Sequence, residues 1–217
     1  MAMDTPALAV GDVSYWLADK VLLAPLSFTL HQHEWVWLTG PSGSGKTTLL
    51  KILAGLLAPT TGSIALRGEE MTALKPEAWR QQVAYCFQTP QLFGASVYDN
   101  LAFPWQIRQR RPDKQALRAS LAQLNLAPDI LEQPIADLSG GERQRVGLLR
   151  YLQFPPAVLL LDEVTSALDN ENKARVKQLI RQTAQQRSMS VLWISHDPQE
   201  IDDGARIISL TRTEARQ

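Results

Sequence analysis

The octapeptide Gly40-Pro41-Ser42-Gly43-Ser44-Gly45-Lys46-Thr47 carries the strongest structural signal in the chain, because it fits a glycine, four further residues and then Gly-Lys-Thr. An apolar run before it, residues 35–38, predicts a buried strand, and residues 48–55 after it predict a helix that Gly55 closes. In that setting the glycines let the backbone N–H groups surround a phosphate chain, and the helix N-terminus adds partial positive charge. A chance glycine-rich turn is the alternative, and the flanking pattern argues against it.

The side chains of this loop predict how a nucleotide would be held. Lys46 is expected to reach the β- and γ-phosphates, and the hydroxyl of Thr47 is expected to ligate Mg²⁺. Thr48 follows in the first turn of the predicted helix. We therefore predict that residues 40–48 bind a nucleotide.

The composition is that of a globular α/β domain without an obvious charged partner. The chain has 217 residues, of which 45% are hydrophobic and 20% charged. Lys+Arg and Asp+Glu both number 22, which predicts neither a nucleic-acid partner nor a lipid surface. Cys86 is the only cysteine, so a cytosolic setting without disulfides is expected. No signal peptide is apparent, and no apolar run approaches the ~18 residues that span a membrane. Any membrane spans are therefore expected from another chain.

Short apolar runs alternate with helical patterns along the chain, which predicts a mostly parallel sheet. Within the second predicted strand, Leu22, Leu26, Phe28 and Leu30 are expected to share a face. Residues 89–137 contain five prolines, Pro104 among them, with helical segments between, and predict a helical insertion. The predicted strands are 7–14, 21–30, 63–66, 83–87, 157–161 and 191–194, and the predicted helices after the insertion begins are 113–124, 139–153 and 171–187.

A second candidate site follows the apolar run Val158–Leu161, where two carboxylates stand in sequence. At the carboxyl end of a central strand they would lie beside the phosphate loop. Asp162 is then placed to bind Mg²⁺, and Glu163 to act as general base on a water that attacks the γ-phosphate. Two solvated acids at a strand end are the structural alternative.

The segment Leu138-Ser139-Gly140-Gly141-Glu142 distinguishes between classes of nucleotide-binding protein. Ser139 with Glu142 three residues later predicts a capping box at a helix N-terminus. The two glycines lower helix propensity, which makes sense where the backbone approaches a ligand closely. A well-capped helix without further function is the alternative.

With this segment the chain resembles the ABC (ATP-binding cassette) ATPases, from about Leu8 to Leu210 and with each expected motif in order. The resemblance implies ATP and Mg²⁺ as cofactors. It also implies the ABC ATPase fold of the P-loop NTPases: a RecA-like core with a mostly parallel sheet, an antiparallel β subdomain and a helical subdomain. Residues 1–217 would form one such domain, with the helical subdomain at about 89–150 inserted in the core.

The resemblance also implies roles for individual residues. Gln88 resembles the Q-loop glutamine, which senses the metal and couples to a membrane partner. Glu163 resembles the catalytic glutamate, and His196 the switch histidine that contacts the γ-phosphate. Tyr15 or Trp16 is expected to stack on adenine. The remaining matches are Gly40–Thr47 with the Walker A loop, Ser139, Gly140, Gly141 and Glu142 with the signature loop, Asp162 with Walker B, and Asp169 with the D-loop.

In this family the signature loop of one cassette completes the ATP site of another, so a homodimer is implied. The resemblance also implies a separate integral membrane permease, with this chain bound peripherally at the cytoplasmic face of the inner membrane. Several phrases, such as Tyr98–Arg108, resemble a small bacterial group of iron-export ATP-binding proteins. The apolar stretch Leu92–Trp105 beside Gln88 is expected to receive a helix of the permease, and internal packing is the alternative. A regulatory, non-transport ABC ATPase and a P-loop small-molecule kinase remain alternative functions.

Overall fold

The computed structural model describes residues 5–212, which form two compact units. Unit 1 contains the chain up to Tyr85, Pro156–Asp162, and the chain from Ser188 onward. Unit 2 contains Cys86–Pro155 and Glu163–Arg187. Among the described residues, no helix is both long enough and apolar enough to cross a membrane.

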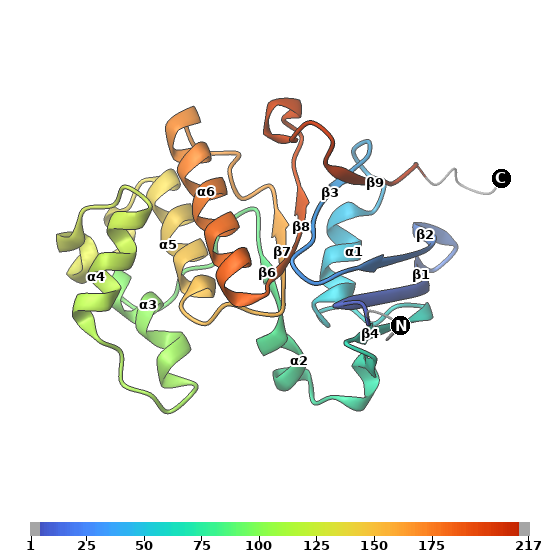
Figure 1. Cartoon of the computed structure of the whole chain (residues 1–217), viewed down its shortest axis with the longest axis horizontal. Helices are drawn as coiled ribbons and strands as arrows, with labels where there is room; N and C mark the ends of the chain where they lie inside the picture. Colours follow the sequence, from blue (N-terminus) through green and yellow to red (C-terminus); the bar gives the residue numbers. More distant parts are fainter. Residues whose placement is uncertain (1–4, 213–217) are drawn as a thin grey trace. The chain divides into compact units, whose positions relative to one another are not determined.

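The core of unit 1 is a five-stranded sheet in the order β6-β7-β8-β3-β9 (Figure 1). Strand β3 (Trp35–Thr39) runs parallel to β8 (Ser190–Ile194) and β9 (Arg206–Ser209), and β7 (Val158–Asp162) runs parallel to β8. Strand β6 (Val83–Cys86) forms the other edge. Every residue of β7 and β8 is buried, as expected for central parallel strands with both faces covered. The predicted parallel sheet is confirmed.

A second sheet in unit 1 is antiparallel and has the order β2-β1-β4-β5. Its long strands β1 (Leu8–Leu17) and β2 (Lys20–Leu30) form a hairpin, and β4 (Thr61–Leu66) pairs with the other side of β1. The short β5 (Glu69–Glu70) completes the sheet.

The face predicted for Leu22, Leu26, Phe28 and Leu30 is interrupted in the first half of β2. Leu23 is buried there, and Leu22 is only half-buried. The pairing of β1 with β2 shifts register three times between Val10 and Trp16. Such irregularities add or remove a residue between partners, so the alternation of faces cannot be extrapolated through them.

Two α-helices accompany the sheets of unit 1. Helix α1 (Lys46–Leu53) begins directly after the predicted phosphate loop. Helix α2 (Pro76–Gln82) carries Trp79, whose buried indole Nε1 donates to the carbonyl of Leu53 at 2.8 Å. This hydrogen bond attaches α2 to the C-terminal end of α1. The 3₁₀ helices of unit 1 are η1 (Met71–Ala73) and η4 (Pro198–Glu200).

Unit 2 is helical, and α3 packs along α5 with α4 beside them (Figure 1). Ser96 and Ser139 cap α3 and α5, each in a complete capping box. Pro104, expected between helical segments, instead lies inside α3 near its C-terminal end, where it has no N–H to donate to the carbonyl of Asn100. The elements of unit 2 are α3 (Val97–Gln106), α4 (Lys114–Gln123), η2 (Pro128–Glu132), η3 (Ile135–Asp137), α5 (Gly140–Leu152) and α6 (Asn170–Arg187).

Candidate functional site

Three predicted site segments of unit 1 lie at one edge of the core sheet. Strands β7, β8 and β3 are neighbours in the sheet, and their pairing sets Asp162 level with Ile194 and Ile194 level with Leu38. The phosphate loop follows β3, Asp162 ends β7, and His196 follows β8. Because all three strands are parallel, these residues meet at the carboxyl edge, where open α/β sheets bind ligands.

The glycines of the loop are required by its close packing. At Gly40, with φ 141°, a Cβ atom would lie 2.4 Å from the carbonyl oxygen of Leu210. At Gly45, with φ 93°, a Cβ would lie 2.5 Å from the carbonyl oxygen of Leu22. Real Cβ atoms do not approach that closely, so no side chain fits at either position. The loop is thereby held against the chain after β9 on one side and against β2 on the other.

The polar side chains of the loop suit an anionic ligand and a cation. Lys46 is buried, and its Nζ donates to the carbonyls of Gly40 at 2.7 Å and Pro41 at 3.1 Å, so its ammonium lies over the loop. The hydroxyl of Ser44 is buried and has no hydrogen-bond partner among the described residues. Thr47 is exposed in the first turn of α1, where its hydroxyl is accessible to a metal ion.

The two carboxylate oxygens of Asp162 differ in their hydrogen bonding. Its Oδ2 accepts a hydrogen bond from the Tyr85 hydroxyl at 2.6 Å, and the carboxylate is almost fully buried. Its Oδ1 is buried without a hydrogen-bond partner in the part of the chain that the structure describes. A buried carboxylate oxygen without a donor is costly, and a cation can satisfy it. A carboxylate oxygen and the hydroxyl of Thr47 are both hard oxygen donors, the kind of ligand that Mg²⁺ prefers.

The turn after β8 is braced by its own side chains. Ser195 donates through its hydroxyl to the Glu200 carboxylate and accepts the backbone N–H of Asp197 at 3.1 Å. His196 stands between these two bonded residues and is exposed. The bracing fixes the backbone on both sides of His196 and leaves its ring accessible.

The structure separates the two candidates for adenine stacking. In the hairpin of β1 and β2, Tyr15 pairs with Leu23 and Trp16 pairs with Val21. Gly45 of the phosphate loop packs against β2 at Leu22, between these two partners. Both aromatic residues are therefore on the strand next to the one that contacts the phosphate loop. Trp16 is 45% exposed, whereas Tyr15 is half-buried. Of the two, Trp16 has the ring surface on which a base could stack.

In unit 2, three residues form a ring of hydrogen bonds around the predicted base. The side-chain amide nitrogen of Gln88 donates to Glu163 Oε2 at 2.9 Å. The side-chain carbonyl oxygen of Gln88 can therefore accept from, or ligate, another partner. The buried amide of Gln144 lies near the backbone carbonyls of both residues, 3.3 Å from that of Gln88 and 3.4 Å from that of Glu163. Glu163 has φ 49°, an uncommon backbone angle for a side chain of this type. The ring therefore ties α5 to the backbone that orients Glu163.

The signature segment forms the capping box that the sequence predicts. The hydroxyl of Ser139 accepts the backbone N–H of Glu142, and the Glu142 carboxylate accepts both the hydroxyl and the N–H of Ser139. These hydrogen bonds lower the pKa of Glu142, and the one from the Ser139 side chain has the largest effect. A Cβ on Gly141 would lie 3.2 Å from Leu168, so this glycine permits packing, whereas Gly140 faces open space.

Asp169 acts as a helix cap in this structure. Its carboxylate accepts the backbone N–H and the side-chain amide of Asn172, both at 2.8 Å, and the backbone bond is the main reason why its pKa is lowered. Arg145 donates to Asn172 Oδ1 at 2.8 Å and to the carbonyls of Gly141 and Leu124. Arg145 thereby joins the signature helix α5 to α6 within unit 2.

Sequence reasoning missed Gln144, Arg145 and Tyr85 as contributors to these sites. Gln144 and Arg145 are both buried, although they lie in a stretch of α5 that reads as polar. A signal was available for Gln144, since it precedes Leu148 by four residues and shares its helix face. Tyr85 gave no such signal, because its partner Asp162 is 77 residues away.

A pocket in unit 2 lies beside Gln88 and measures ≈ 280 Å³ including the space open to solvent. Cys86, Gln144 and Tyr151 are among its lining residues. Cys86 is buried, and this burial raises the pKa of its thiol, which opposes formation of the reactive thiolate. Burial likewise raises the pKa of Tyr151 to about 12. Cys86 is therefore a structural residue of the pocket wall.

The comparisons with known proteins agree on one family. The family model described as "ABC transporter" matches residues 23–166. The probable iron export ATP-binding protein FetA of Escherichia coli K12 is 49% identical, over 97% of this chain and 93% of its own length. The energy-coupling factor transporter ATP-binding protein EcfA1 of Lactiplantibacillus plantarum is 36% identical, over 99% of this chain and 79% of its own length.

A solved structure shows the same fold. The structure of a bacterial Atm1-family ABC exporter with ATP bound superimposes with a TM-score of 0.86 at 25% identity. The match covers 98% of this chain and 38% of the exporter chain. The predicted fold class, with a parallel core sheet, an antiparallel β subdomain and helices, is confirmed.

Proposed function

Because this chain belongs to the ABC transporter family as an ATPase subunit, we propose that it hydrolyses ATP with Mg²⁺ to drive iron export through a separate membrane permease. The name of the E. coli relative supports the iron cargo. The observation that carries the ATPase is the set at the carboxyl edge of the core sheet: the loop with Lys46, the unsatisfied Oδ1 of Asp162, and His196. The family assignment removes the small-molecule kinase as an alternative.

The roles follow from the chemistry of each side chain. Bound ATP supplies a γ-phosphoryl group that water can attack, with Mg²⁺ to neutralise its charge. Residues 40–48 bind the phosphates, and Lys46 exchanges its loop carbonyls for phosphate oxygens. Thr47, Asp162 and the side-chain carbonyl oxygen of Gln88 would ligate the metal. Glu163 takes the proton of the attacking water, and His196 contacts the γ-phosphate.

The remaining assignments concern partners. We propose that residues 1–217 act as one ABC ATPase domain, with the helical subdomain at about 89–150 inserted in the RecA-like core. The chain works as a homodimer at the cytoplasmic face of the inner membrane, without nucleic acid. Ser139–Glu142 then face the nucleotide of the other subunit, with Asp169 at the same interface.

Trp16 is proposed to stack on adenine, and its replacement should weaken ATP binding. Base stacking on an aromatic ring is worth ~1–3 kcal/mol on truncation, so Trp16→Ala should raise the ATP dissociation constant roughly 5- to 150-fold. Trp16→Phe should retain most of the affinity. Tyr15→Ala is the matched comparison, because Tyr15 is the half-buried neighbour. If Tyr15→Ala weakens equilibrium ATP binding and Trp16→Ala does not, the stacking residue is Tyr15.

The permease contact is proposed for the pocket beside Gln88 and the aromatic residues next to it. The guanidinium of Arg150 lines this pocket and lies 4.9 Å from the ring of Phe93, which is 38% exposed. Val97 and Leu101, by contrast, are fully buried. The apolar stretch Leu92–Trp105 thus contains both core and exposed positions. Phe93 is a better anchor for the permease than Val97 or Leu101, because its ring is exposed.

Transport in proteoliposomes tests this function. The chain with its permease should move Fe²⁺ in an ATP-dependent manner, and Phe93→Ala should abolish movement while the isolated chain keeps its basal ATPase rate. A truncated anchor typically costs ≥2 kcal/mol, or about 30-fold in affinity. Leu56→Ala, at another exposed apolar residue, is the control. ATP-dependent transport that is absent for Fe²⁺ and present for another solute would exclude iron as cargo, and full transport by Phe93→Ala would exclude this anchor.

A further inference from the structure

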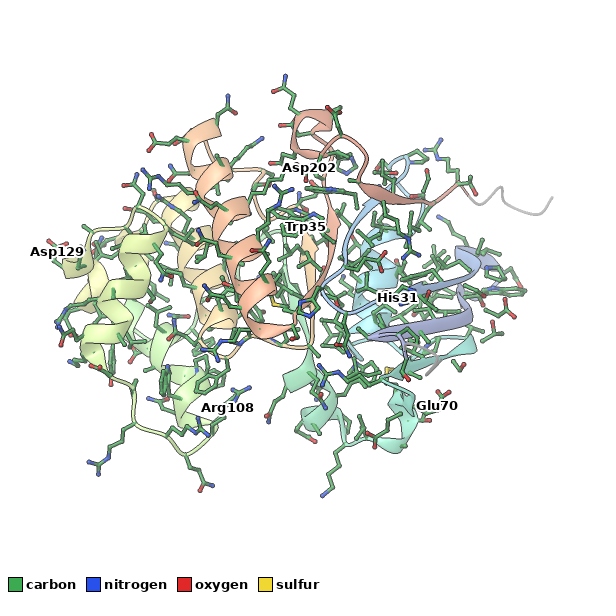
Figure 2. The ribbon with its side chains drawn as sticks, viewed as in Figure 1. His31, Trp35, Glu70, Arg108, Asp129 and Asp202 are labelled. Carbon is green, nitrogen blue, oxygen red and sulfur yellow. The ribbon has the colours of Figure 1, made fainter. Side chains whose placement is uncertain are left out.

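The turn that joins α3 to α4 concentrates positive charge. After Gln106 the chain turns back through Gln109, at φ 54°, and the N–H of Arg110 bonds to the carbonyl of Trp105 at 2.9 Å. This tight turn presents three arginines within four positions, and we call Ile107–Arg111 the basic turn. Arg108 marks its position at the end of α3 in Figure 2.

Among residues 5–212, none of Arg108, Arg110 and Arg111 forms an ion pair. The neighbouring Asp113 uses its carboxylate to cap α4, where it accepts the N–H of Gln115 at 2.8 Å. The guanidinium of Arg108 instead lies 4.4 Å from the ring centre of Phe154, and that of Arg110 lies 5.8 Å from the same centre. Burial, and then the charge of Arg110, lower the pKa of Arg108.

Apolar side chains are exposed next to this charge. Ile107 is 51% exposed and Phe103 40% exposed, although both are large and hydrophobic. They are four residues apart at the end of α3 and therefore share a face. The ring of Phe103 also meets that of Phe93 edge-on at 4.6 Å, which extends the apolar surface away from the basic turn.

Helix stabilisation explains only part of this arrangement. A cation at a helix C-terminus is favourable, and Arg108 serves that role by donating to the carbonyl of Pro104 at 3.0 Å. Arg110 and Arg111, which form no ion pair among residues 5–212, add repulsion to that end of the helix. Helix stabilisation also gives no reason to expose Ile107 and Phe103 beside them.

We propose that the basic turn, with Ile107 and Phe103, rests on anionic lipid headgroups of the membrane that holds the permease. Exposed apolar residues beside arginines are the combination by which proteins bind the membrane interface. Arg110 and Arg111 are exposed, and the pocket of unit 2 is lined by none of the residues of the basic turn, so a diffuse surface of phosphates fits the turn better than a peptide does. The balanced charge of the whole chain conceals this local cluster. The inference rests on the proposed function, because the permease brings the chain to the membrane.

Vesicle binding by the purified full chain tests the proposal. At low salt the chain should co-sediment with vesicles that contain phosphatidylglycerol, bind weakly to pure phosphatidylcholine, and dissociate as salt rises. Each arginine contributes a factor of about 5 in partitioning, so Arg110→Gln/Arg111→Gln should bind roughly 30-fold more weakly. Arg175→Gln/Arg187→Gln on α6 changes the net charge equally and should bind like the parent. Both variants should keep the parent ATPase rate.

Three results would overturn the proposal. Equal loss in the α6 control would make the effect one of net charge. Equal binding to neutral and anionic vesicles would remove the role of the arginines. Release of the permease from the basic-turn variant in detergent, with vesicle binding unchanged, would make the turn a protein contact. Since the vesicle assay needs neither ATP nor permease, its outcome is separate from that of the proposed function.

Discussion

Glu163→Gln is expected to lower the ATPase rate by ~10²–10⁴, which is the usual loss when a general base is removed. The substitution keeps the size and shape of the side chain. Its amide oxygen can still accept the hydrogen bond that Gln88 donates to Glu163 Oε2 at 2.9 Å. The ring formed by Gln88, Glu163 and Gln144 therefore persists, and only the proton acceptor is lost. ATP should still bind, and the ATP-bound dimer should accumulate because it cannot hydrolyse.

Steady-state phosphate release measures the rate, and size-exclusion chromatography with ATP measures the dimer. Glu171→Gln makes the same chemical change on the exposed face of α6, where Glu171 pairs with Arg175, and should leave the rate unchanged. An unchanged rate in Glu163→Gln would show that another group accepts the proton. A rate lost together with ATP binding would instead indicate damage to the binding site.

The parts of the site that the sequence predicts are those encoded by contiguous residues. The loop Gly40–Thr47 is recognisable because a strand, its glycines and a helix follow one another directly. The capping box of Ser139 and Glu142 spans four residues and forms as predicted. In both cases the interacting groups are close in sequence, so local chemistry determines the geometry.

Other features depend on pairing between distant segments. The strand order that brings Asp162, His196 and the loop to one edge arises from contacts over more than a hundred residues. Strand β9 follows a weak pattern and is largely exposed, so only its pairing with β3 reveals it. Because Val13 pairs with Leu26 and Tyr15 pairs with Leu23, β2 carries an extra residue in this interval, and Leu23 rather than Leu22 is buried. The hydrogen-bonded ring around Glu163 joins residues 88, 144 and 163, and no local pattern specifies it.

Mixing two inactive variants is expected to restore activity if each ATP site is shared between chains. Lys46→Ala removes the ammonium that would bind the phosphates. Ser139→Arg places a long cation where the signature helix begins. In a head-to-tail dimer of these two chains, one site collects both lesions and the other none. Each variant alone should be inactive, and the mixture should hydrolyse ATP up to the level of one intact site per mixed dimer.

The arrangement of the lesions provides a matched control with the opposite outcome. When both substitutions are on one chain and this chain is mixed with the parent, each site of the mixed dimer contains one lesion. Such a dimer should be inactive, although it carries the same two substitutions. Ser139→Asp is a useful second variant, because aspartate preserves the N-cap of α5, whose loss costs about 1 kcal/mol, while it brings a negative charge toward the phosphates. The reverse pattern, an active mixed dimer when both lesions are on one chain and an inactive one when they are on two chains, would mean that each chain hydrolyses ATP with its own signature loop.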